Sequence, residues 1–126
     1  MQLNKNNAGL EAEKLAATFL MNHGLKLVAQ NYHCRFGEID LIMQDANSLV
    51  FVEVKLRTSN QFGGAAASIT PQKQQKLILT AQYYLQTQVK NQSQIACRFD
   101  AILISKNHLR PDDLKHIEWI RNAFET

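Results

Sequence analysis

The stretch EIDLIMQDANSLVFVEVKLR, residues 38–57, contains the pattern that decides the fold. Residues 38–43 and 48–57 are rich in Ile, Leu, Val and Phe, which favour β-strands. Between the two runs, Asp45-Ala46-Asn47 has the composition of a tight turn. Strands joined by so short a turn pair in an antiparallel manner, so the sequence predicts a β-hairpin here.

Helical and strand patterns flank this hairpin on both sides. Upstream, apolar residues recur with helical spacing over residues 7–23 and Gly24 is a suitable C-terminal stop, after which residues 25–34 predict a strand and residues 35–37 a turn. Downstream, the Gly- and Ala-rich residues 58–68 predict a loop. Thr70 and Pro71 then predict the cap and first position of a helix that runs to about residue 90. The predicted buried stripe of that helix is Leu77, Ala81, Leu85 and Val89.

The remainder of the chain predicts a strand over residues 98–105, a loop over 106–113 and a last short strand over 114–121. The order is therefore α-β-β-β-α-β-β. A hairpin followed by a crossover helix and further strands implies an α/β fold, with a mixed β-sheet flanked by helices. With 126 residues and 45% hydrophobic content, the chain has material for a single domain over residues 1–126.

Composition and charge narrow the class of protein. The net charge of +3 and the sequence pI of about 9.0 favour polyanionic partners without requiring them. The polar N-terminus and the strand-sized apolar runs predict neither a signal peptide nor a membrane span, so we expect a cytoplasmic protein with no membrane partner. Cys34 and Cys97 stand alone, which predicts free, buried thiols.

The predicted hairpin places several ionisable side chains together. Alternate residues of a strand project to the same face, so Glu53 and Lys55 are neighbours opposite the valines of their strand. On the partner strand, strict alternation places Asp40 on one face with Glu38 and Ile42. The short turn then brings Asp40 close to Glu53.

Two converging carboxylates repel each other, and a hard divalent cation such as Mg²⁺ relieves the repulsion by binding their oxygens. A metal ion held in this way can polarise a phosphoryl oxygen and promote ionisation of water, as phosphodiester hydrolysis requires. Taken alone, however, Glu53 and Lys55 also fit an ordinary solvated charge pair. With Asp40 added, the alternative to a metal site is a structural ion network around Lys55.

Glu13 gives an independent indication. When the residues of the first helix are placed at about 100° intervals, Glu13 falls within the apolar arc, between Leu20 and Ala17. A carboxylate that faces the core needs a partner, because burying it unpaired is unfavourable. A basic residue or a shared metal site would meet that need.

Other polar residues have two interpretations each. Basic side chains near the Gly/Ala loop fit either a phosphate-binding rim or a solvated surface. Asp100 fits a salt bridge with nearby Arg98, and Glu38 fits a turn or sheet-edge role better than a metal ligand. Tyr83 and Tyr84 favour the flank of the core over base stacking. The basic residues in question are Arg35, Arg57, Lys73 and Lys76.

Four segments resemble the YraN family of bacterial endonuclease-like proteins. They are residues 12–16 (AEKLA), 31–42 (NYHCRFGEIDLI), 50–57 (VFVEVKLR) and 98–100 (RFD), and the closing residues 122–124 (NAF) extend the resemblance over nearly the whole chain. The family usually has Gly-Glu where this chain has Ala12-Glu13, which leaves the acid in place. It is similar to the PD-(D/E)XK nuclease superfamily, which includes restriction endonucleases and Holliday-junction resolvases.

The resemblance implies a restriction-endonuclease-like fold and a site made by four residues. Asp40 and Glu53 would be ligands of Mg²⁺ or Mn²⁺, Lys55 the catalytic lysine, and Glu13 an acid that assists metal or water binding. The implied partner is nucleic acid, DNA rather than RNA, and resolvase-like relatives act as dimers, so a homodimer is an expectation to test. Two alternatives stay open: a non-catalytic nucleic-acid-binding or accessory module, and a protein-interaction subunit in which the acids are structural.

Overall fold

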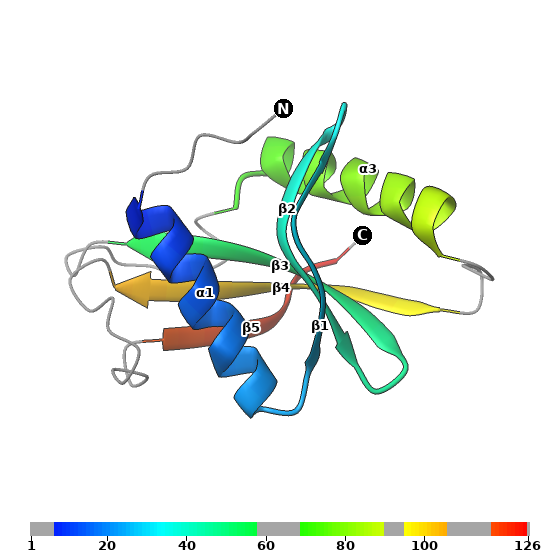
Figure 1. The fold of residues 1–126 in the computed structure, drawn as a ribbon. Helices are drawn as coiled ribbons and strands as arrows, with labels where there is room; N and C mark the ends of the chain where they lie inside the picture. Colours follow the sequence, from blue (N-terminus) through cyan, green and yellow to red (C-terminus); the bar gives the residue numbers. More distant parts are fainter. Residues whose placement is uncertain (1–6, 58–68, 90–94, 106–116, 126) are drawn as a thin grey trace.

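The structure, a computed structural model, describes residues 7–57, 69–89, 95–105 and 117–125. Within these ranges the element order is α-β-β-β-α-β-β, as the sequence predicts. The elements are α1 (Asn7–Asn22), β1 (Lys26–Cys34), β2 (Gly37–Asp45), β3 (Ser48–Arg57), α3 (Pro71–Gln88), β4 (Ala96–Ser105) and β5 (Ile117–Phe124) (Figure 1). The loops predicted over residues 58–68 and 106–113, and residues 90 and 114–116 of the last predicted helix and strand, lie outside the described residues.

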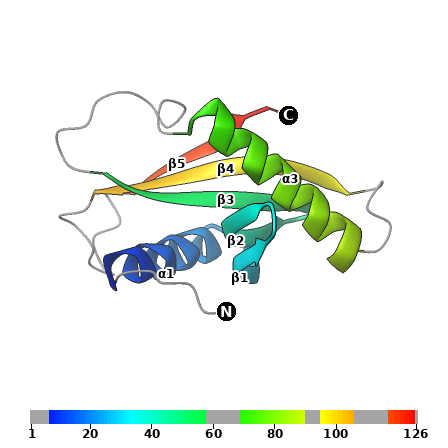
Figure 2. The same ribbon diagram turned by 90° about the horizontal axis from the view of Figure 1, so that it is seen from above.

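The strands form one mixed sheet in the order β1-β2-β3-β4-β5. β3 and β4 are parallel, with α3 between them in sequence, and every other neighbouring pair is antiparallel. α1 covers one face of this sheet and α3 covers the other (Figure 2). The predicted mixed sheet flanked by helices is therefore confirmed.

Each face of the sheet has its own apolar core, and β3 divides its side chains between them by strict alternation. On the α1 side, Val50 and Val52 are fully buried. On the α3 side, Phe51 packs with Leu77 and Ala81 of the helix. Glu53 and Lys55 point to the α3 side with Phe51, because residues two apart share a face.

The N-terminal features of α3 act as predicted, whereas the predicted buried stripe is only half correct: Leu77 and Ala81 are buried, but Leu85 and Val89 are only partly buried. The Thr70 side chain accepts a hydrogen bond of 3.1 Å from the backbone N–H of Lys73, and Pro71 occupies the first helical position. Tyr84 is buried against the α3-side core, which confirms the prediction that it flanks the core. In the described residues, no helix is both long and apolar enough to cross a bilayer.

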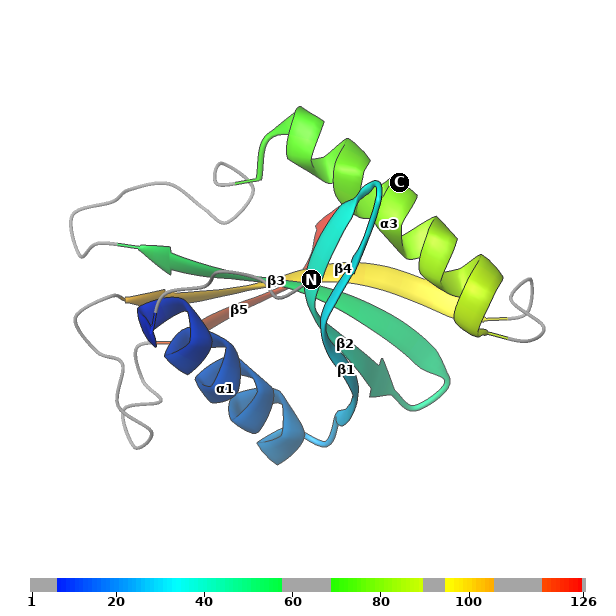
Figure 3. The ribbon, with the colours of Figure 1, turned by 45° about the horizontal axis from the view of Figure 1, so that its top comes forward.

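The predicted alternation of β2 side chains between the two faces of the sheet is wrong before Asp40. Ile39 and Ile42 both pack in the α3-side core, whereas Leu41 and Met43 pack in the α1-side core. Strict alternation would have placed Ile39 with Leu41. The reason is that β2 pairs with β3 only from Leu41 onward, opposite Val52, and its first residues pair with β1 alone. Figure 3 shows this part of the β1–β2 hairpin standing away from β3 toward α3.

The strands β2 and β3 therefore separate at Asp40, and we call this point of separation the fork. The start of β2, residues 37–40, leaves β3 there and packs against α3. Gly37, with a φ of +150°, lies so close to α3 that a Cβ atom there would be 3.1 Å from Oγ1 of the buried Thr80. Tyr32 of β1 packs edge-on against Tyr84, with 5.0 Å between the ring centroids. These contacts hold the hairpin upright beside the helix.

Candidate active site

Asp40 lies at the point where β2 and β3 separate. Its Oδ2 atom accepts a hydrogen bond of 2.9 Å from the backbone N–H of Val54. The backbone pairing of β2 with β3 ends at Leu41 opposite Val52. The Asp40 carboxylate therefore accepts from a β3 amide that has no backbone partner on β2. The side chain is buried, and the hydrogen bond holds it in one orientation.

Glu53 is the neighbour of Val54 and is only 5% exposed. Its carboxyl group is within hydrogen-bonding reach of the Asp40 carboxyl group. Burial and the negative charge of Asp40 raise the pKa of Glu53 to about 7. The approach of Asp40 to Glu53 predicted from the sequence is therefore confirmed. The two carboxylates repel each other when both are ionised.

Two lysines surround this acid pair. The Nζ atom of Lys73, from the first turn of α3, is 2.5 Å from Oε2 of Glu53, and the Nζ atom of Lys55 is 3.9 Å from the same oxygen. Burial alone would lower the pKa of Lys73, but the hydrogen bond and the charge of Glu53 raise it above its usual value. Burial and the charge of Lys73 lower the pKa of Lys55. Lys73 is thus the closer partner of Glu53, and Lys55 is the more easily deprotonated lysine.

Glu13 is buried on the sheet-facing side of α1, as its place in the apolar arc predicts. Its helix packs on the α1-side core, whereas Glu53 and Lys55 lie on the α3 side of the sheet. Over the described ranges, no three side chains of the His, Cys, Asp and Glu types form a group that could hold one metal ion. The role of Glu13 as a third acid of the site stays a prediction.

The basic residues predicted to form a rim have different surroundings. Arg35 is exposed at the β1–β2 turn, where its guanidinium group lies 4.8 Å from the centre of the Phe36 ring. Arg57, at the end of β3, pairs with Glu118 of β5 at 3.0 Å. Lys76 is exposed on α3, one turn beyond Lys73. Lys73 differs from all three, because it contacts the acid pair directly.

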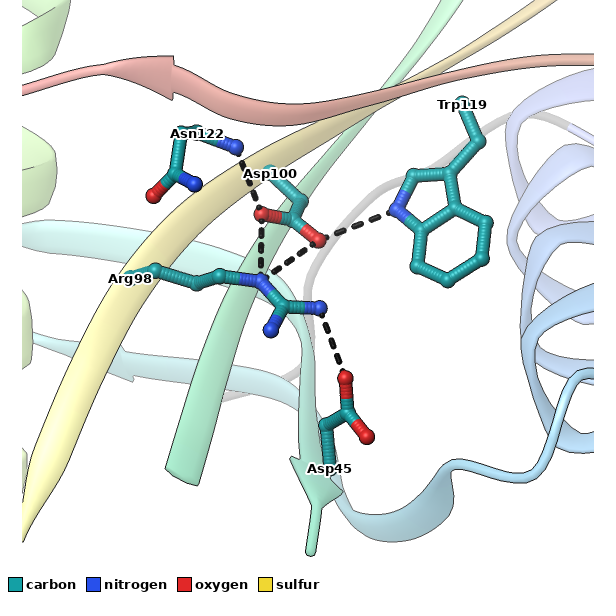
Figure 4. A network of polar contacts seen from close by, with 5 residues as sticks. All are labelled: Asp45, Arg98, Asp100, Trp119 and Asn122. Atoms are coloured by element: carbon teal, nitrogen blue, oxygen red, sulfur yellow. Dashed lines mark hydrogen bonds and ion pairs between the residues drawn. The ribbon is translucent and has the colours of Figure 1, made fainter. Parts of the chain in front are cut away.

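Asp100 belongs to a separate network, shown in Figure 4. The Nε atom of Arg98 donates to both Asp100 oxygens at 3.0 and 3.2 Å, and its Nη2 atom donates to Asp45 at 3.0 Å. Asp100 also accepts from the Trp119 indole at 2.9 Å and from the backbone N–H of Asn122 at 3.0 Å. The predicted salt bridge is confirmed, and the network ties β2, β4 and β5 together.

Comparison with known sequences places the chain in a family. A family model described as "Uncharacterised protein family UPF0102" matches residues 12–104. The chain belongs to the UPF0102 family. A UPF0102 protein of Nitrosomonas europaea is 53% identical over 119 residues, which cover 94% of each chain. Another, from Psychromonas ingrahamii, is 48% identical over 120 residues, 95% of this chain and 91% of the relative.

The matched region of this UPF0102 chain contains every residue of the fork and of the Asp100 network except those in β5. The family membership expected from the sequence is thus confirmed. The acids fit a hard divalent cation in one respect, because two buried carboxylates in contact repel each other and a cation would relieve that repulsion. A cation would have to share Glu53 with the Lys73 ammonium group.

Sequence reasoning missed the place of Lys73 within the acid cluster of this UPF0102 chain. The available signal was its position: it is the third residue of a helix that follows the strand carrying Glu53 and crosses back to a parallel strand. Trp119 and Asn122 were missed as partners of Asp100, because both come from β5, which contacts β4 only in the folded chain. The free state of Cys34 and Cys97 is confirmed, but neither is buried: Cys34 is half-buried and Cys97 is exposed.

Proposed function

We propose that this protein is a cytoplasmic, metal-dependent endonuclease that hydrolyses phosphodiester bonds in DNA, with branched or otherwise structured DNA as its substrate. The observation that carries the proposal is the buried contact between Asp40 and Glu53, with two lysines beside it at a fork in the sheet. The resemblance to the PD-(D/E)XK nucleases supports the same chemistry and the choice of DNA.

Asp40 and Glu53 would hold Mg²⁺ or Mn²⁺ through their carboxylate oxygens. When bound, such an ion supplies Lewis-acid polarisation of a phosphoryl oxygen and favours ionisation of the attacking water. Asp40 is already oriented by Val54, so it needs no rearrangement to act as a ligand. The family resemblance assigns Glu13 a part in metal or water binding. From α1 it would act through water and not as a direct ligand, because it lies on the other side of the sheet from Glu53.

Lys55 would stabilise the charge that develops on the phosphate or orient the water. Its surroundings favour this role, since burial and Lys73 both lower its pKa and make proton exchange at Nζ easier. Arg35, Lys76 and Arg57 would contact phosphates further along the DNA, with Arg57 available in part because it already pairs with Glu118.

The direct test is incubation of the purified protein with branched, nicked and single-stranded DNA in the presence of Mg²⁺ or Mn²⁺. We expect metal-dependent cleavage by the wild type and none by Asp40→Asn. Absence of cleavage by the wild type, or equal cleavage by the variant, would refute the proposal.

A second candidate is a non-catalytic module that binds nucleic acid with the same fold. The observation in its favour is the ion pair between Lys73 and Glu53, which neutralises the acid without a metal ion. This candidate predicts salt-dependent binding that needs no divalent ion and survives Glu53→Ala. Loss of binding in that variant, or a strict requirement for Mg²⁺, would exclude it.

A further inference from the structure

We infer that Lys73 gates divalent-cation binding at the fork: its ammonium group holds the Glu53 carboxylate and must leave it before a cation can bind there. The inference rests on the proposed function, since it concerns the same acid pair. It assigns to Lys73 a task different from phosphate contact on the surface.

The distances single out Lys73 as the competitor. Its Nζ atom is 2.5 Å from Oε2 of Glu53, so the two groups form a direct ion pair. Lys55 is 3.9 Å from the same oxygen, at the limit of an ion pair. A cation that binds Oε2 must therefore displace Lys73, whereas Lys55 can stay where it is.

Burial decides which of the two partners moves. The Glu53 side chain is 5% exposed and lies on a strand that is paired with β4 along its whole length. The Lys73 side chain is 43% exposed and has four rotatable carbons. The Glu53 side chain cannot move into solvent without disrupting the sheet, but the ammonium group of Lys73 can.

The backbone of Lys73 provides a fixed pivot for this movement. Its N–H group is held by the Thr70 cap, and Pro71 restrains the chain just before it. The exchange therefore needs no change in α3 and involves one side chain.

Charge balance supplies the driving force. In their ionised forms the two acids, Asp40 and Glu53, carry two negative charges, and the two lysines beside them carry two positive ones. Adding a divalent cation while both lysines stay would leave an excess of two positive charges in a half-buried site, which is unfavourable. Departure of Lys73 removes the closer of the two repelling charges.

The test is calorimetric titration of MnCl₂ into the full-length wild type, Lys73→Met, Lys73→Gln and Lys76→Met. Lys76→Met is the matched control, because Lys76 is an exposed lysine one turn away on the same helix. We expect both Lys73 variants to bind Mn²⁺ at least about tenfold more tightly than the wild type, and Lys76→Met to bind it with wild-type affinity. Lys73→Gln keeps a hydrogen-bond donor for Glu53, so it guards against loss of folding.

Thermal unfolding gives a second readout that does not depend on activity. Without metal ions, Lys73→Met should have a lower Tm than the wild type, because Glu53 loses its closest cation. Saturating Mn²⁺ should raise the Tm of this variant more than that of the wild type.

The outcomes separate the gate from the proposed function. If the wild type binds Mn²⁺ and the Lys73 variants bind it equally well or more weakly, the gate is refuted while the metal site stands. If Mn²⁺ binds none of the four proteins, the gate and the metal-dependent activity both fall. An equal gain in Lys76→Met would also overturn the gate, because the effect would then be one of general surface charge.

Discussion

The backbone N–H of Val54 donates a 2.9 Å hydrogen bond to the carboxylate of Asp40, at the point where β2 separates from β3. A side chain thus occupies the place of a strand partner. The contact orients Asp40 and also fixes the position of Glu53, which directly precedes Val54. The same hydrogen bond therefore stabilises the fork and sets the relative positions of Asp40 and Glu53.

Asp40→Ala and Asp40→Asn should differ in the free energy of unfolding but lose cleavage activity to a similar extent. Asp40→Ala leaves the half-buried Val54 N–H without its acceptor and should lower the free energy of unfolding by about 1–3 kcal/mol. Asp40→Asn keeps an acceptor oxygen, so its loss should be under about 1 kcal/mol. Cleavage of branched DNA with Mg²⁺ should fall at least about 100-fold in both.

Urea unfolding and cleavage rates measured on the same preparations provide the check. Equal stability of the two variants would show that the contact between Val54 and Asp40 contributes little to folding. Retained cleavage by the stable Asn variant would remove Asp40 from the chemistry.

Glu53 should make the protein less stable as the pH rises. Its pKa is about 7 in the folded protein against an ordinary value of 4.5, so the unfolded chain releases this proton at a lower pH than the folded one does. The stability that the protonated group contributes is full below about pH 4.5 and is lost as the pH rises through about 7. The loss is on the order of 3 kcal/mol.

Glu53→Gln should abolish that part of the pH dependence, since the amide does not ionise. The measurement is the free energy of unfolding of both proteins from pH 4.5 to pH 8, and the difference between them isolates Glu53. We expect the variant to gain on the wild type across this window. Parallel curves would mean that Glu53 titrates normally in the folded protein.

Gly37→Ala should weaken the support of the hairpin by α3. The added Cβ atom would meet Thr80 Oγ1 at 3.1 Å, and the φ of +150° is unfavourable for alanine. We expect a loss of about 2–3 kcal/mol in the free energy of unfolding. Gly24→Ala is the control, because Gly24 also has a positive φ, +93°, but a Cβ atom there has no neighbour within 4 Å.

The Gly24 variant should lose only the backbone term, about 1 kcal/mol. If thermal or urea unfolding gives the same loss for both variants, the close approach of Gly37 to α3 has no energetic weight. A larger loss at Gly37 measures the contact with Thr80.

Asp100→Asn should destabilise the protein without changing the chemistry. The Asp100 side chain has no solvent exposure and accepts from Arg98, Trp119 and Asn122, so removing its charge leaves Arg98 poorly compensated. The expected loss is about 3 kcal/mol. Cleavage per folded molecule, assayed well below the Tm, should equal that of the wild type.

Asp45→Asn provides the comparison for Asp100, because Asp45 is 38% exposed and contacts Arg98 through one oxygen. Its loss should be under about 1 kcal/mol. A large fall in cleavage by folded Asp100→Asn would assign that acid to the active site instead of the framework.

Local patterns were sufficient to predict most of the fold. β3 was predicted with its observed bounds, and the start of α3 was predicted from Thr70 and Pro71, because strand alternation and helix capping depend on residues close in sequence. The shared face of Glu53 and Lys55 follows from the same alternation.

The features that could not be predicted from the sequence depend on contacts between residues far apart in the chain. The break in alternation at Asp40 arises because the hairpin leaves β3 and packs on Thr80 of α3, about forty residues later in the chain. The pairing of Lys73 with Glu53 requires the crossover that sets the first turn of α3 beside β3. The extension of β5 to Phe124 includes Asn122, whose positive φ of 52° is supported by a hydrogen bond to Asp100.

The most direct measurement of the central claim is anomalous diffraction at the manganese edge from crystals of the protein grown with MnCl₂. If the acid pair is a metal site, an anomalous peak will lie between the carboxylates of Asp40 and Glu53, with the Lys73 ammonium group moved off Glu53, and Asp40→Asn crystals will lack the peak. Crystals that bind Mn²⁺ elsewhere, with Lys73 still bonded to Glu53, would contradict the account.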